Sequence, residues 1–381
     1  MTARTRLAAY YFAYFTYAGA FVPYFTLFLA ARGLSAAQIA VVMAMPQLAR
    51  IFAPALWGWL ADTWGMRFGG AGRAIVLFSG AVLVAGYASL YAVRGFAGVA
   101  TVMLVLSILA AGALPIVESI TLGALEGRSG DYGPIRLWGS IGFILGVLGL
   151  GVWLDQQAPS TVLHWVLALA AASFAVSFAL PRFAVPRPAH GQAGVGTVLR
   201  RAEVVAFFGA CFCMTVAHGA MYAFYSIYLE AAGYSKTVIG VLWTLGVVAE
   251  VLVFLFLPRI LRRFGLRALL LASFACAVVR FFAIGWGVGA IALLAVAQLL
   301  HAATFGTYHA AAIASVHRFF PGALAARGQA LYSSIGFGLG GSAGILLAGW
   351  TWDALGPELT FTLSAGFGLV GLVLVAWRVR V

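Results

Sequence analysis

The chain has 381 residues, of which 64% are hydrophobic and only 9% are charged, whereas a typical soluble domain is about 25% charged. Ten acidic residues and a single lysine, Lys236, are too few to cover the surface of a soluble globule. The composition therefore excludes a soluble enzyme, a nucleic-acid-binding protein and a disordered chain, and it indicates a polytopic membrane protein.

The net charge of +13 is not a nucleic-acid signature here, because the basic residues form short clusters between long apolar runs. The three cysteines, Cys211, Cys213 and Cys276, all fall inside apolar runs. An odd number of cysteines with none in a loop argues against a disulfide framework, and we interpret all three as small buried hydrophobic residues.

Twelve segments are long and apolar enough to span a bilayer as helices, since each has roughly 20 mostly apolar residues. An alternating pattern typical of a β-barrel is absent from them. The predicted spans are 7–31, 37–61, 74–93, 97–125, 133–153, 161–180, 204–229, 237–258, 267–286, 289–315, 327–350 and 358–377.

The basic residues between these spans predict the orientation of the chain, because they are divided unequally between the two sides of the membrane. One set of alternate loops holds only Arg32, Arg94 and Lys236, and the other set, with the two termini, holds seventeen basic residues. Because basic loops stay in the cytoplasm, we expect both termini there, in a bacterial inner membrane. Seventeen basic residues fall on the cytoplasmic side: Arg4, Arg6, Arg67, Arg73, Arg128, Arg182, Arg187, Arg200, Arg201, Arg259, Arg262, Arg263, Arg267, Arg318, Arg327, Arg378 and Arg380.

The sequence also repeats itself, which predicts two six-helix halves. Residues 1–180 form the first half, 181–203 a basic cytoplasmic loop, and 204–381 the second half. With an offset of 200, Gly65 and Arg67 match Gly265 and Arg267; with an offset of 194, the segment 137–146 resembles 331–340. The predicted fold class is an all-α membrane protein with twelve helices in two pseudo-symmetric halves.

Several ionisable residues fall inside the predicted spans, where a charge at the bilayer centre costs about 2.5–3.5 kcal/mol on insertion scales. Such groups either line a transport pathway or hold helices together as ion pairs, and we favour the pathway for the set as a whole. The set comprises Arg50, Glu118, Arg136, Glu250, Arg280, His218, His301 and His309.

Positions equidistant from a hairpin apex lie at the same depth, which suggests which of these residues could meet. This rule pairs Glu118 with Arg136, Arg280 with His301, and His218 with Glu250. In the tenth span, six polar or aromatic residues recur at three- and four-residue spacing and so share one helix face. They are Gln298, His301, Thr304, Phe305, Tyr308 and His309.

Two parallel six-helix repeats joined by a basic loop resemble the major facilitator superfamily. The segment from Gly58 to Arg67, with Asp62 and then Arg73, is similar to the cytoplasmic loop signature of that superfamily. The resemblance implies that Asp62, Arg67 and Arg73 act in gating. The second half keeps Gly265 and Arg267 but has Arg262 in place of the acid.

The segments Pro115–Glu118, Asp131–Ser140, Leu245–Glu250 and His301–Phe305 resemble the phenylpropionate permease family, which is related to the lactose permease group of proton symporters. The resemblance implies substrate contacts from Glu118 and Arg136 and proton-coupling roles among Glu250, Arg280 and His301. It breaks in the tenth span, where Thr304 replaces the main proton-carrying carboxylate and Gln298 replaces a lysine. Proton coupling therefore has to fall to Glu250 or Glu118, supported by histidines.

We therefore predict a secondary transporter that imports a small, aromatic organic acid together with protons. Substrate contacts are predicted for Glu118, Arg136, Glu250, His301, Phe305, Tyr308 and His218, and proton coupling for Glu250, Glu118, Arg280, His301 and His309. A proton-coupled sugar or nucleoside symporter is the alternative. No Walker, HExxH or nucleophilic motif supports an enzyme, and we expect a monomer without cofactor or metal.

Overall fold

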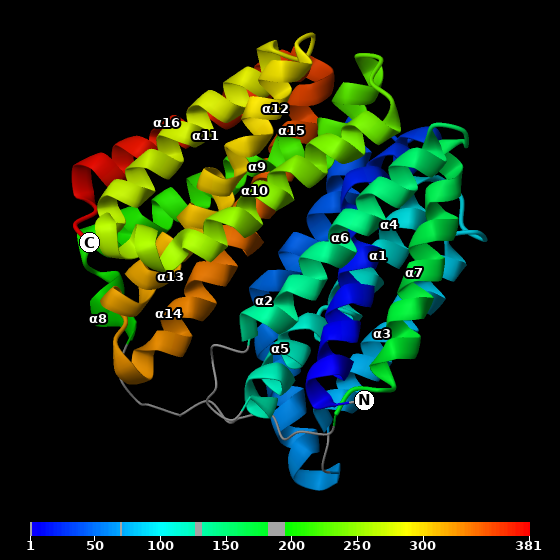
Figure 1. Cartoon of the computed structure of the whole chain (residues 1–381), viewed down its shortest axis with the longest axis horizontal. Coiled ribbons are helices and arrows are strands. Elements are labelled where there is room, and N and C mark those ends of the chain that lie inside the picture. The colour runs from blue at the N-terminus through cyan, green and yellow to red at the C-terminus, as the bar shows by residue number, and fades with distance from the viewer. Residues whose placement is uncertain (1, 69–70, 126–131, 182–194) are drawn as a thin grey trace. The chain divides into compact units, whose positions relative to one another are not determined.

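The computed structural model describes residues 2–68, 71–125, 132–181 and 195–381, and within these ranges every regular element is a helix (Figure 1). Twelve helical stretches among them are long and apolar enough to cross a membrane, and each predicted span overlaps one of these. The predicted all-helical, twelve-span fold class is thereby confirmed.

The chain divides into two compact units, Met1–Arg187 with Ser235–Gly240, and Pro188–Tyr234 with Val241–Val381. The predicted central loop 181–203 lies largely outside the described residues, and the described part of it contains α8 (Val195–Leu199). The helices of the first unit are α1 (Ala3–Ala31), α2 (Ala36–Phe68), α3 (Ala71–Ser89), α4 (Gly95–Leu109), α5 (Ala113–Ala124), α6 (Tyr132–Leu154), η2 (Pro159–Thr161) and α7 (Val162–Ser177).

The second unit contains two π-helical segments inside its spans. The tenth span consists of α12 (Ile291–Leu299), the π-helix η3 (Ala302–Thr307) and α13 (Tyr308–Phe319); the eleventh consists of α14 (Ala325–Tyr332), the π-helix η5 (Ser333–Gly340) and α15 (Gly341–Leu355). The remaining helices are α9 (Ala202–Ala231), α10 (Lys236–Arg263), α11 (Leu266–Trp286), η4 (Gly322–Leu324) and α16 (Pro357–Arg378).

The fourth span is broken between α4 and α5, where the sequence pattern predicts one continuous helix over 97–125. The indole Nε1 of Trp57 donates a hydrogen bond of 3.1 Å to the Ile108 carbonyl, and Ser79 Oγ donates one of 3.3 Å to the Leu109 carbonyl. Gly112 leaves room for the Trp57 ring, since an added Cβ would lie only 2.8 Å from it. Neighbouring helices thus satisfy the carbonyl groups beside the break, as a membrane requires.

Glycines bring the first and fifth spans of each unit into close contact. In the first unit α1 lies beside α6 (Figure 1), and a Cβ at Gly142 or Gly146 would overlap backbone atoms of Phe12 or Thr16. Small residues allow this close approach of two helix backbones in a membrane.

The second unit repeats this crossing between α9 and α15. A Cβ at Gly340 would clash with Phe212 and Thr215, and one at Gly344 with Val216. Gly142 and Gly340 differ by 198 positions, as do Gly146 and Gly344. The contacts therefore relate the two spans by an offset of 198, whereas the sequence match gave an offset of 194. The two offsets differ by four residues, about one helical turn, and a shift of one turn still aligns apolar residues and glycines with one another.

An arginine also joins the third and sixth spans in each unit. Arg73 Nη2 donates to the Phe178 carbonyl just beyond α7, and Arg267 Nη2 donates to the Ala376 carbonyl in the last turn of α16 at 2.6 Å. A cation is favourable at a helix C-terminus, where carbonyl groups lack helical partners. Arg73, for which the sequence suggests gating, thus makes a helix-terminus contact within its own unit.

We predict that Gly146→Ala destabilises the protein, whereas Gly149→Ala in the same helix does not. The Cβ at Gly146 would overlap the Thr16 carbonyl oxygen, but the Cβ at Gly149 would lie 3.9 Å from the nearest ring atom of Trp165. Overpacking typically costs about 1–3 kcal/mol, so the melting temperature of purified Gly146→Ala should fall by several degrees. Equal melting temperatures for the two variants would show that α1 and α6 do not need this close contact.

Candidate functional site

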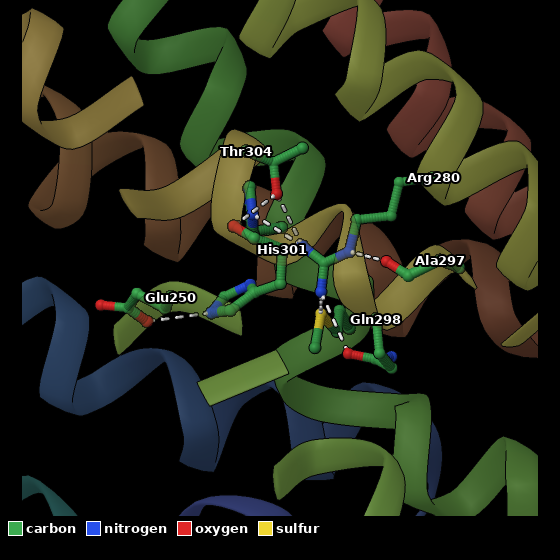
Figure 2. Close-up of polar contacts among 8 residues, drawn as sticks. Glu250, Arg280, Ala297, Gln298, His301 and Thr304 are labelled. Carbon is green, nitrogen blue, oxygen red and sulfur yellow. Dashed lines mark hydrogen bonds and ion pairs between the residues drawn. The ribbon is translucent and has the colours of Figure 1, made fainter. Parts of the chain in front are cut away.

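The guanidinium of Arg280 on α11 is fully buried and is surrounded by neutral hydrogen-bond acceptors (Figure 2). Its Nε donates to the Ala297 carbonyl at 3.0 Å, and Nη1 donates to Thr304 Oγ1 at 2.8 Å. Nη2 donates to Met221 Sδ at 2.9 Å and to Gln298 Oε1 at 3.3 Å. These contacts come from α9, α12 and η3, so one cation links three segments to α11.

His218 on α9 completes this cluster, because its Nε2 lies 3.3 Å from Arg280 Nη1. Its Nδ1 lies 2.8 Å from the Met214 carbonyl oxygen. Arginine has only donors and a carbonyl oxygen only accepts, so the neutral tautomer with hydrogen on Nδ1 satisfies both contacts. His218 therefore accepts from Arg280 and donates to its own helix.

The carboxylate of Glu250 pairs with His301, as Figure 2 shows, at an Oε2–Nε2 distance of 3.4 Å. The two side chains are 19% and 10% exposed. Glycines bring the helices together here: a Cβ at Gly306 would lie 3.3 Å from Glu250 Cγ, and one at Gly246 would lie 3.4 Å from the His301 side chain. Nδ1 of His301 is buried and makes no hydrogen bond within the described part of the chain, so this imidazole has unused hydrogen-bonding capacity.

The π-helix η3 aligns three rings of the tenth span into a stack. The rings of His301 and Phe305 are 5.3 Å apart and 15° from parallel, and those of Phe305 and His309 are 6.0 Å apart and 12° from parallel. The wider turn of a π-helix brings residues four apart closer to vertical alignment than an α-helix does. His309 Nδ1 then lies 2.9 Å from the hydroxyl of Tyr332 on α14. The stack thus connects the Glu250–His301 pair to a second histidine.

The six residues predicted to share one face of the tenth span therefore point in different directions. His301, Phe305 and His309 form the stack, whereas Gln298 and Thr304 bind Arg280. Tyr308 is 2% exposed and packs edge-on against Phe274 of α11, with ring centroids 5.8 Å apart. Tyr308 is thus buried between helices, and the substrate contact that its spacing suggested stays a prediction.

The equal-depth rule identified the right layer of residues but not the partners. It paired Arg280 with His301 and His218 with Glu250, whereas the structure joins Arg280 to His218 and Glu250 to His301. Depth along a helix follows from residue counting. The direction in which a side chain points depends also on the rotation of each helix, which the count does not contain.

In the first unit, Arg136 on α6 lies against aromatic rings of α1. Its guanidinium carbon is 4.0 Å from the Phe15 ring centroid and 5.6 Å from that of Tyr11. Gly139 makes room for this arrangement, since an added Cβ would lie 2.6 Å from Arg136 Nη1. Arg136 is half-buried, so a cation, an aromatic wall and partial exposure occur together.

Glu118 on α5 belongs to the same cluster. The charges of Arg136 and Arg50 act on its carboxylate, so the structure brings these three charged residues near one another. The predicted proximity of Glu118 and Arg136 agrees with this arrangement. Asp62 and Arg67 are the other two predicted gating residues, and the structure describes their backbone in α2 but not their side chains.

Two aromatic residues beside the cluster of Arg280 and His218 were not among the site residues predicted from the sequence. Tyr222 stacks on His218, with ring centroids 6.0 Å apart, and Trp243 of α10 stacks on Tyr222 at 6.4 Å. The spacing of His218 and Tyr222 by one helical turn was the available signal. Among the described residues, no three His, Cys, Asp or Glu side chains come together as possible metal ligands.

Comparison with known proteins connects this arrangement with a family, since residues 4–363 match the model of the MFS_1 like family. The chain belongs to this family. It is a multi-pass membrane transporter of the major facilitator superfamily and not an enzyme, which confirms the family resemblance seen in the sequence.

Two relatives and one structure show the range of similar proteins. The chain is 32% identical to the "Probable 3-phenylpropionic acid transporter" of Escherichia coli (strain K12), over 94% of this chain and 93% of that one. It is 27% identical to the "Maltose permease" of Geobacillus stearothermophilus, over 99% and 95%. A mutant of the nucleoside transporter NupG has the same fold, with a TM-score of 0.88 over all of both chains and 18% identity.

Proposed function

We propose that this transporter is a proton symporter that imports a small aromatic carboxylate by alternating access. The observation that carries the proposal is the half-buried guanidinium of Arg136, which lies 4.0 Å from the Phe15 ring centroid. A guanidinium binds a carboxylate through two parallel hydrogen bonds, and an aromatic wall accepts a flat apolar ring. The "Probable 3-phenylpropionic acid transporter" is named for a molecule that has both groups.

A proton-coupled sugar or nucleoside symporter is the alternative, because similar proteins are named for maltose and nucleosides. In that case Glu118 and Glu250 would accept hydrogen bonds from substrate hydroxyl groups. The two proposals differ in the group that Arg136 would meet. An anion would pair with the positive charge of Arg136, whereas a neutral sugar could only accept hydrogen bonds from its guanidinium.

Glu250 is the proposed proton carrier. Thr304 and Gln298 stand where the related symporters have a carboxylate and a lysine, and neither side chain can titrate. Arg280 is surrounded by neutral acceptors, so its charge does not neutralise Glu250 directly. The contact between Glu250 and His301 places two groups that can each hold a proton 3.4 Å apart. His309 extends this titratable set through the ring stack, and Glu118 is the second candidate.

We predict that Arg136→Lys weakens the binding of 3-phenylpropionate while leaving the fold intact. Lysine keeps the positive charge but cannot form the two-pronged contact, so affinity should fall by about 1.5–3 kcal/mol, the worth of a hydrogen bond to a charged group. Binding to the purified protein can be measured by calorimetry, with maltose and uridine as competing ligands.

Arg32→Lys is the matched control, because Arg32 also lies over a ring, 4.6 Å from the Phe28 centroid, at the end of α1. This control should lower the melting temperature by removing hydrogen bonds to the Leu90 and Val93 carbonyls, without changing affinity. If a well-folded Arg136→Ala protein binds 3-phenylpropionate normally, Arg136 does not anchor the substrate. Tight binding of maltose or uridine instead would favour the alternative function.

We expect Glu250→Gln to abolish uptake of substrate against its gradient while exchange of substrate across the membrane continues. Glutamine has nearly the shape of glutamate and still accepts a hydrogen bond, but it cannot carry a proton. Uptake and counterflow are measured in vesicles with an imposed pH gradient. Glu358→Gln serves as control, since Glu358 lies in the first turn of α16. Accumulation by Glu250→Gln would rule out Glu250 and make Glu118 the next candidate.

For the topology we propose that both termini face the cytoplasm of a bacterial inner membrane and that the protein acts as a monomer. The orientation rests on the unequal distribution of basic residues between the two sets of loops. Reporter fusions at Arg201 and after Val381 should both give a cytoplasmic signal. A periplasmic signal from either fusion would contradict the proposed orientation.

A further inference from the structure

A basic pocket of about 590 Å³ lies in the second unit where α9 begins and α16 ends. It is lined by Arg201, Ala202, Glu203, Trp377, Arg378 and Arg380. Arg201 forms an ion pair with Glu203, which leaves Arg378 and Arg380 as the lining charges not matched by an acidic lining residue. The pocket therefore favours an anionic ligand, and the proposed transport site does not use it.

The position of the pocket relates it to the membrane surface. α9 and α16 pack against each other, and both are membrane-spanning helices, of which α9 begins and α16 ends at this pocket. Trp377 is 67% exposed, and the guanidinium carbon of Arg378 lies 4.2 Å from the centroid of the Trp377 ring. Tryptophan is enriched at the level of lipid headgroups, where one end of the ring is apolar and the other is wet.

An exposed apolar stripe leads along α16 to this pocket. Val370, Val373 and Trp377 are spaced three and four residues apart, so they share one face of the helix, and they are 50%, 54% and 67% exposed. In a membrane such a face contacts acyl chains. A charged pocket at the end of an acyl-chain surface suits a molecule that carries an anionic headgroup and apolar tails together.

We propose that this pocket binds the phosphodiester headgroup of an anionic phospholipid, with the acyl chains lying along Val370 and Val373 of α16. Arg378 and Arg380 supply the charge for the phosphate, and Trp377 anchors the headgroup level. A free phosphate would use the same arginines but would gain nothing from the apolar stripe. Basic pockets between spanning helices are suited to lipid headgroups.

Titration of the purified full-length protein with short-chain phosphatidylglycerol tests this proposal, with the melting temperature as readout. Phosphatidylglycerol should raise the melting temperature, whereas phosphatidylcholine and inorganic phosphate should not. In Arg378→Gln/Arg380→Gln the apparent affinity for phosphatidylglycerol should be about tenfold or more weaker, since each surface arginine contributes to attraction of anionic lipid. Both side chains are exposed, so this variant should fold.

The matched control is Arg262→Gln/Arg263→Gln, which removes two exposed arginines from the last turn of α10. Arg263 also lies near an aromatic ring, 5.8 Å from the Phe264 centroid, but neither residue lines the pocket. This control should keep the affinity of the unsubstituted protein. Equal weakening in both double variants, or an equal shift with inorganic phosphate, would overturn the lipid site.

Discussion

The second unit is organised around one buried cation, Arg280, because a charge inside a membrane must find its partners within the protein. Its hydrogen bonds reach His218 and Met221 on α9, Ala297 and Gln298 on α12, and Thr304 on η3. A guanidinium with fixed donor directions holds these segments in one register. Since His301 follows Gln298 by less than a turn, the same network also determines where the Glu250–His301 pair lies.

Such a network requires helix backbones that approach one another closely, and glycine provides this approach. Gly246 and Gly306 let α10 come near the tenth span, so that the short side chain of Glu250 reaches His301. Gly344 does the same between α9 and α15, as Gly146 does between α1 and α6. The π-helix η3 then adjusts the rotation of the tenth span: Thr304 faces Arg280 while Phe305 stacks on His301. Close crossings and a local change of helix type thus satisfy two polar clusters from one helix.

The sequence is sufficient for the spans and for the ionisable residues within them, because hydrophobic length and misplaced charge are both visible without coordinates. It is insufficient for the partners of those residues. The exchange of partners among His218, Glu250, Arg280 and His301 depends on helix rotation, and the π-helices that alter this rotation leave no spacing signal. The break before Gly112 is likewise invisible, since Trp57, which satisfies the Ile108 carbonyl beside it, is distant in the sequence.

In the function that we propose, the fold and the substrate are determined by different residues. Apolar spans and glycine crossings can be satisfied by many sequences, which explains how a nucleoside transporter with 18% identity has a TM-score of 0.88 with this chain. Charge at a few positions is more restrictive. Arginine keeps its proton in proteins, so the charge of Arg280 stays constant, and a proton gained by Glu250 or His301 changes the net charge of the cluster by a full unit. A cluster with one fixed cation and one adjustable pair suits the proton coupling that we propose, and the cation beside the rings of Phe15 and Tyr11 suits the proposed anionic substrate.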